Sequence, residues 1–272
     1  MPLTPAHAAV APLLQRIVRP LGFTVPMSAL VIGTMTPDFS YLLRLAPGGG
    51  DWHTKVGVFV YCLPAGLAVW LIYRALIAPA LLRLMPPGLG AAAASRVAAG
   101  PTYRLIPGAI VAIFAGVISH DVWDGFTHSA DWGVRLVPVL HRNLHYGATG
   151  MVRWYLILQY LSSVVGLLVV AAILWQWVAA QPPEARQVPA GERAWRVRDA
   201  GLLLLSATAG AALNSARPHP SSISWSLGYA SVGAMAALAV ALFAYGIFDS
   251  LRCRFASGEA SVRVTQCREA PT

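Results

Sequence analysis

Long apolar stretches separated by short polar segments dominate this chain. Three of them have the length of a bilayer crossing and cover residues 56–77, 105–123 and 154–178. About 20 apolar residues suffice for a helix to cross the hydrocarbon core. A fourth clear stretch covers 229–248, and a weaker one covers 201–212. The pattern predicts an all-α fold, a polytopic transmembrane helical bundle with about five spans.

The first 46 residues depart from this pattern because prolines interrupt them repeatedly. Thr4 followed by Pro5 predicts a helix start, with Thr4 as the N-cap and the proline at the first helical position. The apolar residues that follow share one helical face: Val10, Leu13, Leu14, Ile17 and Val18. Residues 21–46 are apolar but broken, which predicts a half-length helix at 29–35. We therefore expect an N-terminal amphipathic or re-entrant segment before the first span.

Composition and charge agree with a membrane protein. The 272 residues are 57% hydrophobic and only 11% charged, whereas soluble domains carry about 25% charged residues. The net charge of +9 would suit nucleic-acid binding, but the basic residues lie between the apolar stretches, where loops meet anionic lipid. Membrane lipids, and no nucleic acid, are thus the expected partners. The three cysteines lack metal-ligand spacing, which argues against a thiolate site and a disulfide framework.

The distribution of basic residues also predicts an orientation. With five spans, twelve arginines lie in the loops of one side and eight basic residues lie on the other. We expect the protein to lie in the plasma (inner) membrane, and the positive-inside rule then places its C-terminus in the cytoplasm. We divide the chain into a metal-site membrane domain (1–180), two further transmembrane helices (199–250) and a polar tail (251–272).

The segment from Ser119 to His128 concentrates two histidines and two aspartates at the end of the second span. An isolated aspartate near the bilayer centre costs about 2.5–3.5 kcal/mol, so such groups need mutual pairing, a proton path or a bound metal. His120, Asp124 and His128 are four residues apart and are neighbours on one helical face. Imidazole and carboxylate together suit zinc, with manganese or iron as alternatives. Asp121 lies on an adjacent stripe of the same helix.

Simpler interpretations compete with a metal at each of these positions. A lone histidine near a helix end is more often a hydrogen-bonded structural residue, but four ionisable groups in nine residues favour function. Asp38 follows an apolar run at a proline break, a position that would face a cavity. His141 and His145 are also four residues apart, but their polar loop favours solvation over ligation.

Several of these segments together resemble a known family. They are Thr4-Pro5-Ala6-His7, Ala29 to Phe39 with its Thr36-Pro37-Asp38, His53-Thr54-Lys55-Val56-Gly57, His120 to His128, and Leu158 to Ser163. They look like the bacterial membrane family of unknown function called DUF4184, over about residues 1–180. That family is in turn distantly similar to the YdjM-type membrane-bound metal-dependent hydrolases.

The resemblance implies a ligand set for a divalent metal. Carried over position by position, the ligands are His7, Asp38, His53, His120, Asp124 and His128. Asp121 stands where we would expect an apolar or neutral residue. Whether it adds a ligand or pairs with an arginine stays open at this point.

Three functions are compatible with the sequence. The first is a metal-dependent hydrolase that acts on a lipid or lipid-linked (phospho)ester at the extracytoplasmic face, with Asp38 or Asp121 as a general base or a ligand of a second ion. The second is a non-catalytic membrane protein with a structural metal or an ion-pair cluster. The third is an ion or proton transporter, which should carry ionisable residues inside several spans.

Overall fold

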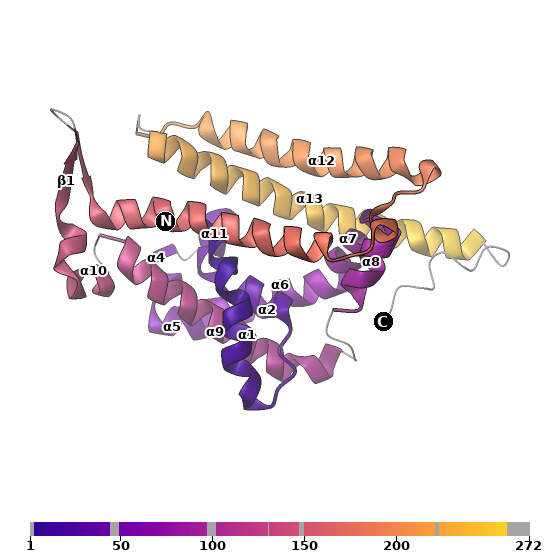
Figure 1. Ribbon diagram of the computed structural model, residues 1–272, viewed down its shortest axis with the longest axis horizontal. Helices are drawn as coiled ribbons and strands as arrows, with labels where there is room; N and C mark the ends of the chain where they lie inside the picture. The colour runs from indigo at the N-terminus through magenta and orange to yellow at the C-terminus, as the bar shows by residue number, and fades with distance from the viewer. Residues whose placement is uncertain are drawn as a thin grey trace. The chain divides into compact units, whose positions relative to one another are not determined.

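A computed structural model describes residues 3–43, 49–96, 102–129, 131–146, 150–220 and 223–259. This part of the chain is almost entirely helical, and its one sheet is the hairpin of β1 (Asn143–Tyr146) and β2 (Gly150–Arg153) (Figure 1). The structure therefore confirms the all-α prediction. The chain forms two compact units. Unit 1 comprises Met1–Leu67 and Leu105–Gln176, and unit 2 comprises Ala68–Arg104 and Trp177–Thr272.

Four helices in the described residues are long and apolar enough to cross a membrane. They cover Lys55–Leu84, Thr102–Thr127 (α9), Trp154–Ala179 (α11) and Trp225–Phe255, the last within α13 (Ile223–Glu259). These helices contain the four clear stretches of the sequence and fit a membrane protein. The weaker stretch at 201–212 lies in α12 (Ala190–Ser215), which is not among the four.

The expectation of five spans is thus corrected to four among the described residues. The physical reason is the polar start of α12, whose first ten residues include Glu192, Arg193, Arg196, Arg198 and Asp199. The leucine-rich half that follows is too short to cross the hydrocarbon core by itself. The helix α13 continues to Glu259, so the beginning of the predicted polar tail is helical, and residues 260–272 lie outside the described part.

The first spanning helix is locally widened twice. It runs through α5 (Lys55–Gly57), α6 (Leu63–Ile72) and α7 (Ala78–Leu84), with π-helical turns at Val58–Cys62 (η4) and Tyr73–Ile77 (η5). Each π turn ends two residues before a proline, Pro64 or Pro79. Proline has no N–H, and its ring clashes with the carbonyl one turn earlier, so the backbone widens there without ending the helix.

Short helices precede this span in unit 1. They are η1 (Thr4–Val10), α1 (Ala11–Val18), η2 (Arg19–Leu21), α2 (Met27–Gly33), η3 (Thr36–Asp38), α3 (Phe39–Leu43) and α4 (Gly49–Trp52). The half-length helix predicted at 29–35 corresponds to α2. The predicted N-cap role of Thr4 is wrong, because the helix starts at Thr4 itself and makes no side-chain cap bond. Its hydroxyl donates to Asp38 instead.

Two close backbone approaches hold unit 1 together. A Cβ atom on Gly116 of α9 would lie 2.6 Å from the backbone nitrogen of Thr34, so glycine lets the end of α2 pack directly on α9. A Cβ atom on Gly166 of α11 would lie 2.7 Å from the carbonyl oxygen of Ala6. The Leu3 N–H donates to Ser163 Oγ of the same helix at 3.0 Å. The N-terminal segment is thereby fixed between α9 and α11.

Unit 2 consists of the remaining helices: the end of the first span, α8 (Pro87–Ala94), η7 (Pro183–Arg186), α12 and α13. The helices α12 and α13 pack closely at Gly210, where an added Cβ atom would lie 2.4 Å from the carbonyl oxygen of Gly233. Asn214 Nδ2 donates to the Tyr229 carbonyl at 2.7 Å across this interface. Two buried aspartates, Asp199 and Asp249, each meet an arginine.

Candidate metal centre

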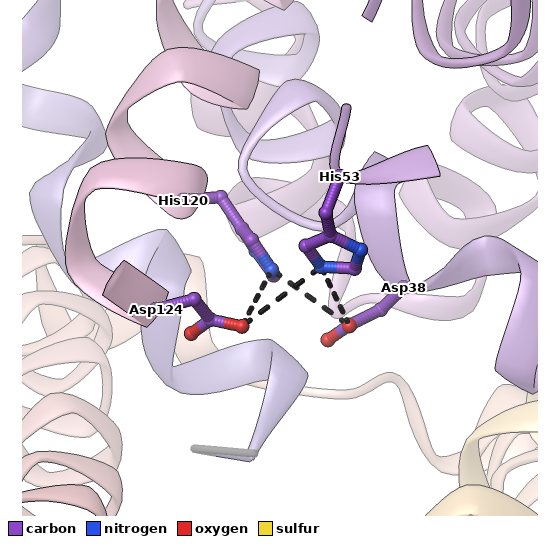
Figure 2. A group of neighbouring side chains, drawn as sticks. All are labelled: Asp38, His53, His120 and Asp124. Carbon is purple, nitrogen blue, oxygen red and sulfur yellow. Dashed lines mark ion pairs between the residues drawn. The ribbon is translucent and has the colours of Figure 1, made fainter. Parts of the chain in front are cut away.

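Four side chains from three parts of unit 1 converge at one point. Asp38 ends η3, His53 follows α4, and His120 and Asp124 lie one turn apart on α9 (Figure 2). The i, i+4 spacing on α9 therefore aims both side chains at the same place, as the sequence predicted. Asp38 and His53, more than sixty residues away in the chain, complete the group.

The distances between the donor atoms match a shared cation. His120 Nε2 lies 3.3 Å from Asp124 Oδ2 and 3.7 Å from Asp38 Oδ1. His53 Nε2 lies 3.9 Å from each of the same two oxygens. All four donors lie within 4.8 Å of one another. Since ligands about 2.0–2.1 Å from a tetrahedral zinc ion are about 3.3–3.4 Å apart, the cluster could hold a metal ion after small movements.

Of the four side chains, that of His53 is the most exposed. The side chains of Asp38 and His120 are fully buried and that of Asp124 is 5% exposed, whereas that of His53 is 23% exposed. The ring centre of Tyr41 lies 6.3 Å from that of His53. The centre is therefore largely shielded from its surroundings, and His53 is the ligand at its edge.

A backbone carbonyl fixes the orientation and tautomer of His120. Its Nδ1 lies 2.8 Å from the Thr34 carbonyl oxygen, which can only accept a hydrogen bond. Nδ1 must therefore carry the proton, and in the neutral ring Nε2 is left with a lone pair that faces Asp38 and Asp124. A ligating histidine that donates its other N–H to a carbonyl is the usual arrangement around protein metals.

Asp38 is held in the same way by the N-terminal segment. Thr4 Oγ1 donates to Asp38 Oδ2 at 2.5 Å, which leaves Oδ1 to face the two histidines. Burial raises the pKa of the Asp38 carboxyl, while the neighbouring His120 and the Thr4 hydrogen bond act in the opposite direction. A cation at Oδ1 would favour the charged carboxylate further.

The buried polar atoms of this region face one another without hydrogen bonds. Among the described residues, His7 Nε2, Asp38 Oδ1, His120 Nε2 and Asp124 Oδ1 are buried and have no hydrogen-bond partner. Buried polar atoms are nearly always satisfied, so four together require an explanation. Carboxylate oxygens present lone pairs, and so does the Nε2 atom of His120 in the neutral ring, and a cation between these atoms would satisfy them all. The donor set therefore fits a metal.

His7 lies immediately beside the cluster without belonging to it. Its ring stacks on that of His120, with centres 4.0 Å apart, and its Nε2 lies 3.5 Å from Asp124 Oδ1. Burial, followed by the neighbouring His120, lowers the pKa of His7 to about 3. The ring is thus neutral at physiological pH, and it faces the oxygen of Asp124 that the four-residue cluster leaves unused.

The other residues predicted for the site lie at its margin or away from it. His128 follows the last residue of α9, and its Nδ1 lies 3.0 Å from the Asp124 carbonyl oxygen and 3.7 Å from Asp124 Oδ2. Asp121 is outside the cluster, although its Oδ1 is buried without a hydrogen-bond partner among the described residues. His141 and His145 are exposed and take no part in the cluster.

Two groups that orient the ligands were not predicted from the sequence. The Thr34 carbonyl is a backbone group, so no residue type in the sequence identifies it. The small residues Gly33 and Gly116 allow the close approach that brings this carbonyl to His120. Thr4 looked like a helix cap, because a threonine before a proline is typical of one.

Comparison with known proteins places the chain in a family. The sequence matches the family described as domain of unknown function (DUF4184) over residues 1–247, and the chain belongs to it. The match extends beyond the 180 residues that carried the resemblance in the sequence. No curated protein matches the chain, and no solved structure matches it.

Proposed function

We propose that the chain is a membrane-embedded, metal-dependent hydrolase that acts on a lipid or lipid-linked (phospho)ester. The observation that carries this proposal is the cluster of two imidazoles and two carboxylates, with donor atoms within 4.8 Å of one another, near the end of a helix that is long and apolar enough to span a membrane. A divalent ion held there lowers the pKa of a coordinated water toward about 7 and polarises a phosphoryl or acyl oxygen. The position near a helix end suits a substrate anchored in the bilayer.

The donor chemistry favours catalysis over a purely structural role. Structural zinc sites are mostly built from cysteines, whereas catalytic sites combine histidine with aspartate or glutamate. Cys62 is buried in the same unit, but its thiol donates to the Trp52 carbonyl at 3.3 Å and it is not part of the cluster. Zinc is therefore the metal we favour, with manganese or iron as alternatives for this oxygen-rich donor set.

We assign distinct roles to the carboxylates. Asp38 and Asp124 hold the metal through one oxygen each, because the second oxygen of Asp38 accepts the Thr4 hydroxyl and that of Asp124 faces His7. Asp121, three residues before Asp124 on α9, is the general base or a ligand of a second ion. His7 and His128 adjoin the cluster at Asp124 and would be further ligands if a second ion binds.

We further propose that the protein lies in the plasma (inner) membrane. The predicted orientation, with an extracytoplasmic centre and a cytoplasmic C-terminus, required five spans. Four spans put the start of the first spanning helix, the end of α9 and the C-terminus on the same side, so this combination does not carry over. Membrane lipids are then both the surroundings and the source of the substrate.

One specific observation favours a second function, a structural metal site. The four protein donors suffice to complete a tetrahedral shell, which is the arrangement of non-catalytic zinc. Zinc can expand to five ligands, so the partly exposed His53 side decides whether water has room to bind. A transporter is less well supported, because α11 contains no aspartate, glutamate, lysine, arginine or histidine.

Metal analysis and an assay on the same preparations separate these functions. The full chain, purified in detergent, should contain about one zinc ion and cleave phospholipid vesicles in a chelator-sensitive manner. The His120→Ala variant should lose both properties. The Asp121→Asn variant should keep the metal but lose about 10²–10⁴-fold in kcat if this residue is the base.

The matched control is Asp51→Asn, which removes an exposed carboxylate outside the cluster and should change neither property. Stoichiometric metal without cleavage of any lipid ester would favour the structural site. Purified protein that binds no transition metal would refute both.

A further inference from the structure

The segment that joins α9 to α11 is the feature on which this inference rests. It comprises residues 131–146 and 150–153, with α10 (Trp132–Leu136), η6 (Pro138–His141) and the strands β1 and β2, and we call it the connecting segment. Both helices that it joins are long and apolar enough to span a membrane. Its two ends therefore lie at the same membrane surface, a few residues from the bilayer boundary.

The connecting segment exposes large apolar side chains although it is not a span. Leu136 is 70% exposed and Met151 is 59% exposed, and Trp132, Val139 and Leu144 are exposed as well. Scattered exposed apolar residues are common, but five in a single surface loop at a membrane boundary indicate contact with lipid. Trp132 in particular is a residue type that prefers the headgroup level of a bilayer.

The same segment is cationic. Arg135, Arg142 and Arg153 are exposed, and none of them forms an ion pair with a carboxylate of the described residues. The only acidic residue of the segment is Asp131. Guanidinium groups that meet no carboxylate of the described residues, beside exposed apolar side chains, fit phospholipids, which combine a charged phosphate with apolar chains.

The hairpin carries apolar side chains on both of its faces. In the antiparallel register, Leu144 pairs with Val152, His145 with Met151 and Asn143 with Arg153. Directly paired residues share a face and neighbouring pairs alternate, so Leu144 and Val152 lie on one face, and Met151 lies with Arg153 on the other. The second face thus combines an exposed apolar side chain with a guanidinium group, which suits an interface between hydrocarbon and headgroups.

We infer that the connecting segment is a binding surface for anionic phospholipid headgroups. Its apolar side chains insert at the headgroup level, and Arg135, Arg142 and Arg153 bind the lipid phosphates. The inference does not require that the metal centre be catalytic. If that centre does hydrolyse lipid esters, the surface concentrates anionic phospholipids beside α9.

Hydrogen–deuterium exchange of the full chain in nanodiscs tests this surface directly. Nanodiscs of phosphatidylcholine alone are compared with nanodiscs that contain phosphatidylglycerol in addition. Amides of the connecting segment should exchange at least about fivefold more slowly with the anionic lipid, since each arginine near an anionic surface contributes about fivefold in affinity. High salt should remove most of this difference because it screens the charges.

Two variants distinguish lipid binding from a folding defect. Changing Arg135, Arg142 and Arg153 together to glutamine should abolish the lipid-dependent slowing, while changing all three to lysine should retain most of it. The exchange of α13 amides, far along the chain, and the metal content report whether each variant remains folded.

The outcomes decide the proposal independently of any enzymatic activity. Equal exchange of the connecting segment in both lipids would overturn it. Slowing that depends on two copies of the chain per nanodisc, and not on lipid charge, would identify a second copy as the occupant and would also overturn it. Slowing that survives in the glutamine variant would show that charge is not the cause.

Discussion

The two units of this chain both bury aspartates, but they compensate the charge in opposite ways. In unit 2, Arg83 Nε donates to Asp249 Oδ2 at 2.8 Å, and Arg198 Nε donates to Asp199 Oδ1 at 2.8 Å. In unit 1, Asp38 and Asp124 face histidines and meet no lysine or arginine among the described residues. The buried acids of unit 2 are therefore neutralised by the protein, and those of unit 1 are left for something else to neutralise.

This difference shows why burial alone does not identify a functional site. A buried carboxylate costs several kcal/mol unless a partner compensates it, and an arginine removes that cost without creating any reactivity. The carboxylates of unit 1 are arranged around His120 Nε2, and a neutral His120 has a lone pair there that cannot satisfy theirs. A cation bound between them satisfies all of these atoms, and the following variants test whether one is present.

The largest expected effect is the loss of metal when one ligand is removed. His120→Ala should lower the metal content from about one ion per chain to less than about 0.1 after dialysis, because one of four donors is gone. Asp249→Asn should leave the metal content unchanged, since its carboxylate is paired with Arg83 in unit 2. Elemental analysis of the purified variants measures both.

Thermal unfolding provides the reciprocal control. Asp249→Asn should destabilise the protein by about 1–3 kcal/mol, a value reduced because the Arg83 side chain is 30% exposed and partly solvated. Excess chelator should destabilise wild type but not His120→Ala. If Asp249→Asn released the metal, or if chelator acted equally on wild type and His120→Ala, the contrast between the units would be wrong.

The second expected effect concerns Thr4, which orients Asp38 from the N-terminal segment. Thr4→Val keeps the shape of the side chain but removes the hydroxyl that donates to Asp38 Oδ2. Loss of a hydrogen bond behind a metal ligand typically lowers metal affinity by about 10–100-fold. Competition with a coloured chelator measures this affinity. Thr208→Val is the control, because that exposed threonine bonds only to the Leu205 carbonyl on its own helix.

The sequence predicted the helices much better than their contacts. Apolar stretches of about 20 residues identified the four spanning helices, because the bilayer imposes that length on any helix that crosses it. The stretch at 201–212 was wrongly predicted to be a span. Its leucines follow the charged first turns of α12, so the helix is too polar to be among the four. Whether a helix can span the membrane therefore depends on the length of its uninterrupted apolar part and on the charges that adjoin it.

The centre was predictable where helical spacing governs it. His120 and Asp124 are one turn apart on α9, so their convergence follows from the geometry of the helix. The approach of Asp38 and His53 depends on the packing of α2 and α4 against other helices, which no local pattern encodes. The resemblance to DUF4184 supplied both residues, and it also supplied His7 and His128, which lie just outside the four-residue cluster.

The smallest expected effect is the pH dependence with which the N-terminal segment opens. Burial lowers the pKa of His7 to about 3, compared with about 6.5 in water. At pH values between these two pKa values, His7 binds a proton when the segment is open but not when it is closed. Acidification from pH 6.5 should therefore favour opening of residues 4–10 by up to about 1.4 kcal/mol per pH unit. Amide exchange of this segment, corrected for intrinsic rates, measures the opening.

Two variants test whether His7 is the source of this pH dependence. His7→Gln should abolish it, whereas His219→Gln should not, because that half-buried ring lies near the backbone carbonyls of Ser215 and Pro220. If acid closed the segment instead, the protonated His7 would stabilise the closed state by pairing with Asp124 Oδ1, 3.5 Å away. The protein would then compensate Asp124 with a cationic side chain of its own, as it compensates the buried acids of unit 2, and the contrast between the units would be lost.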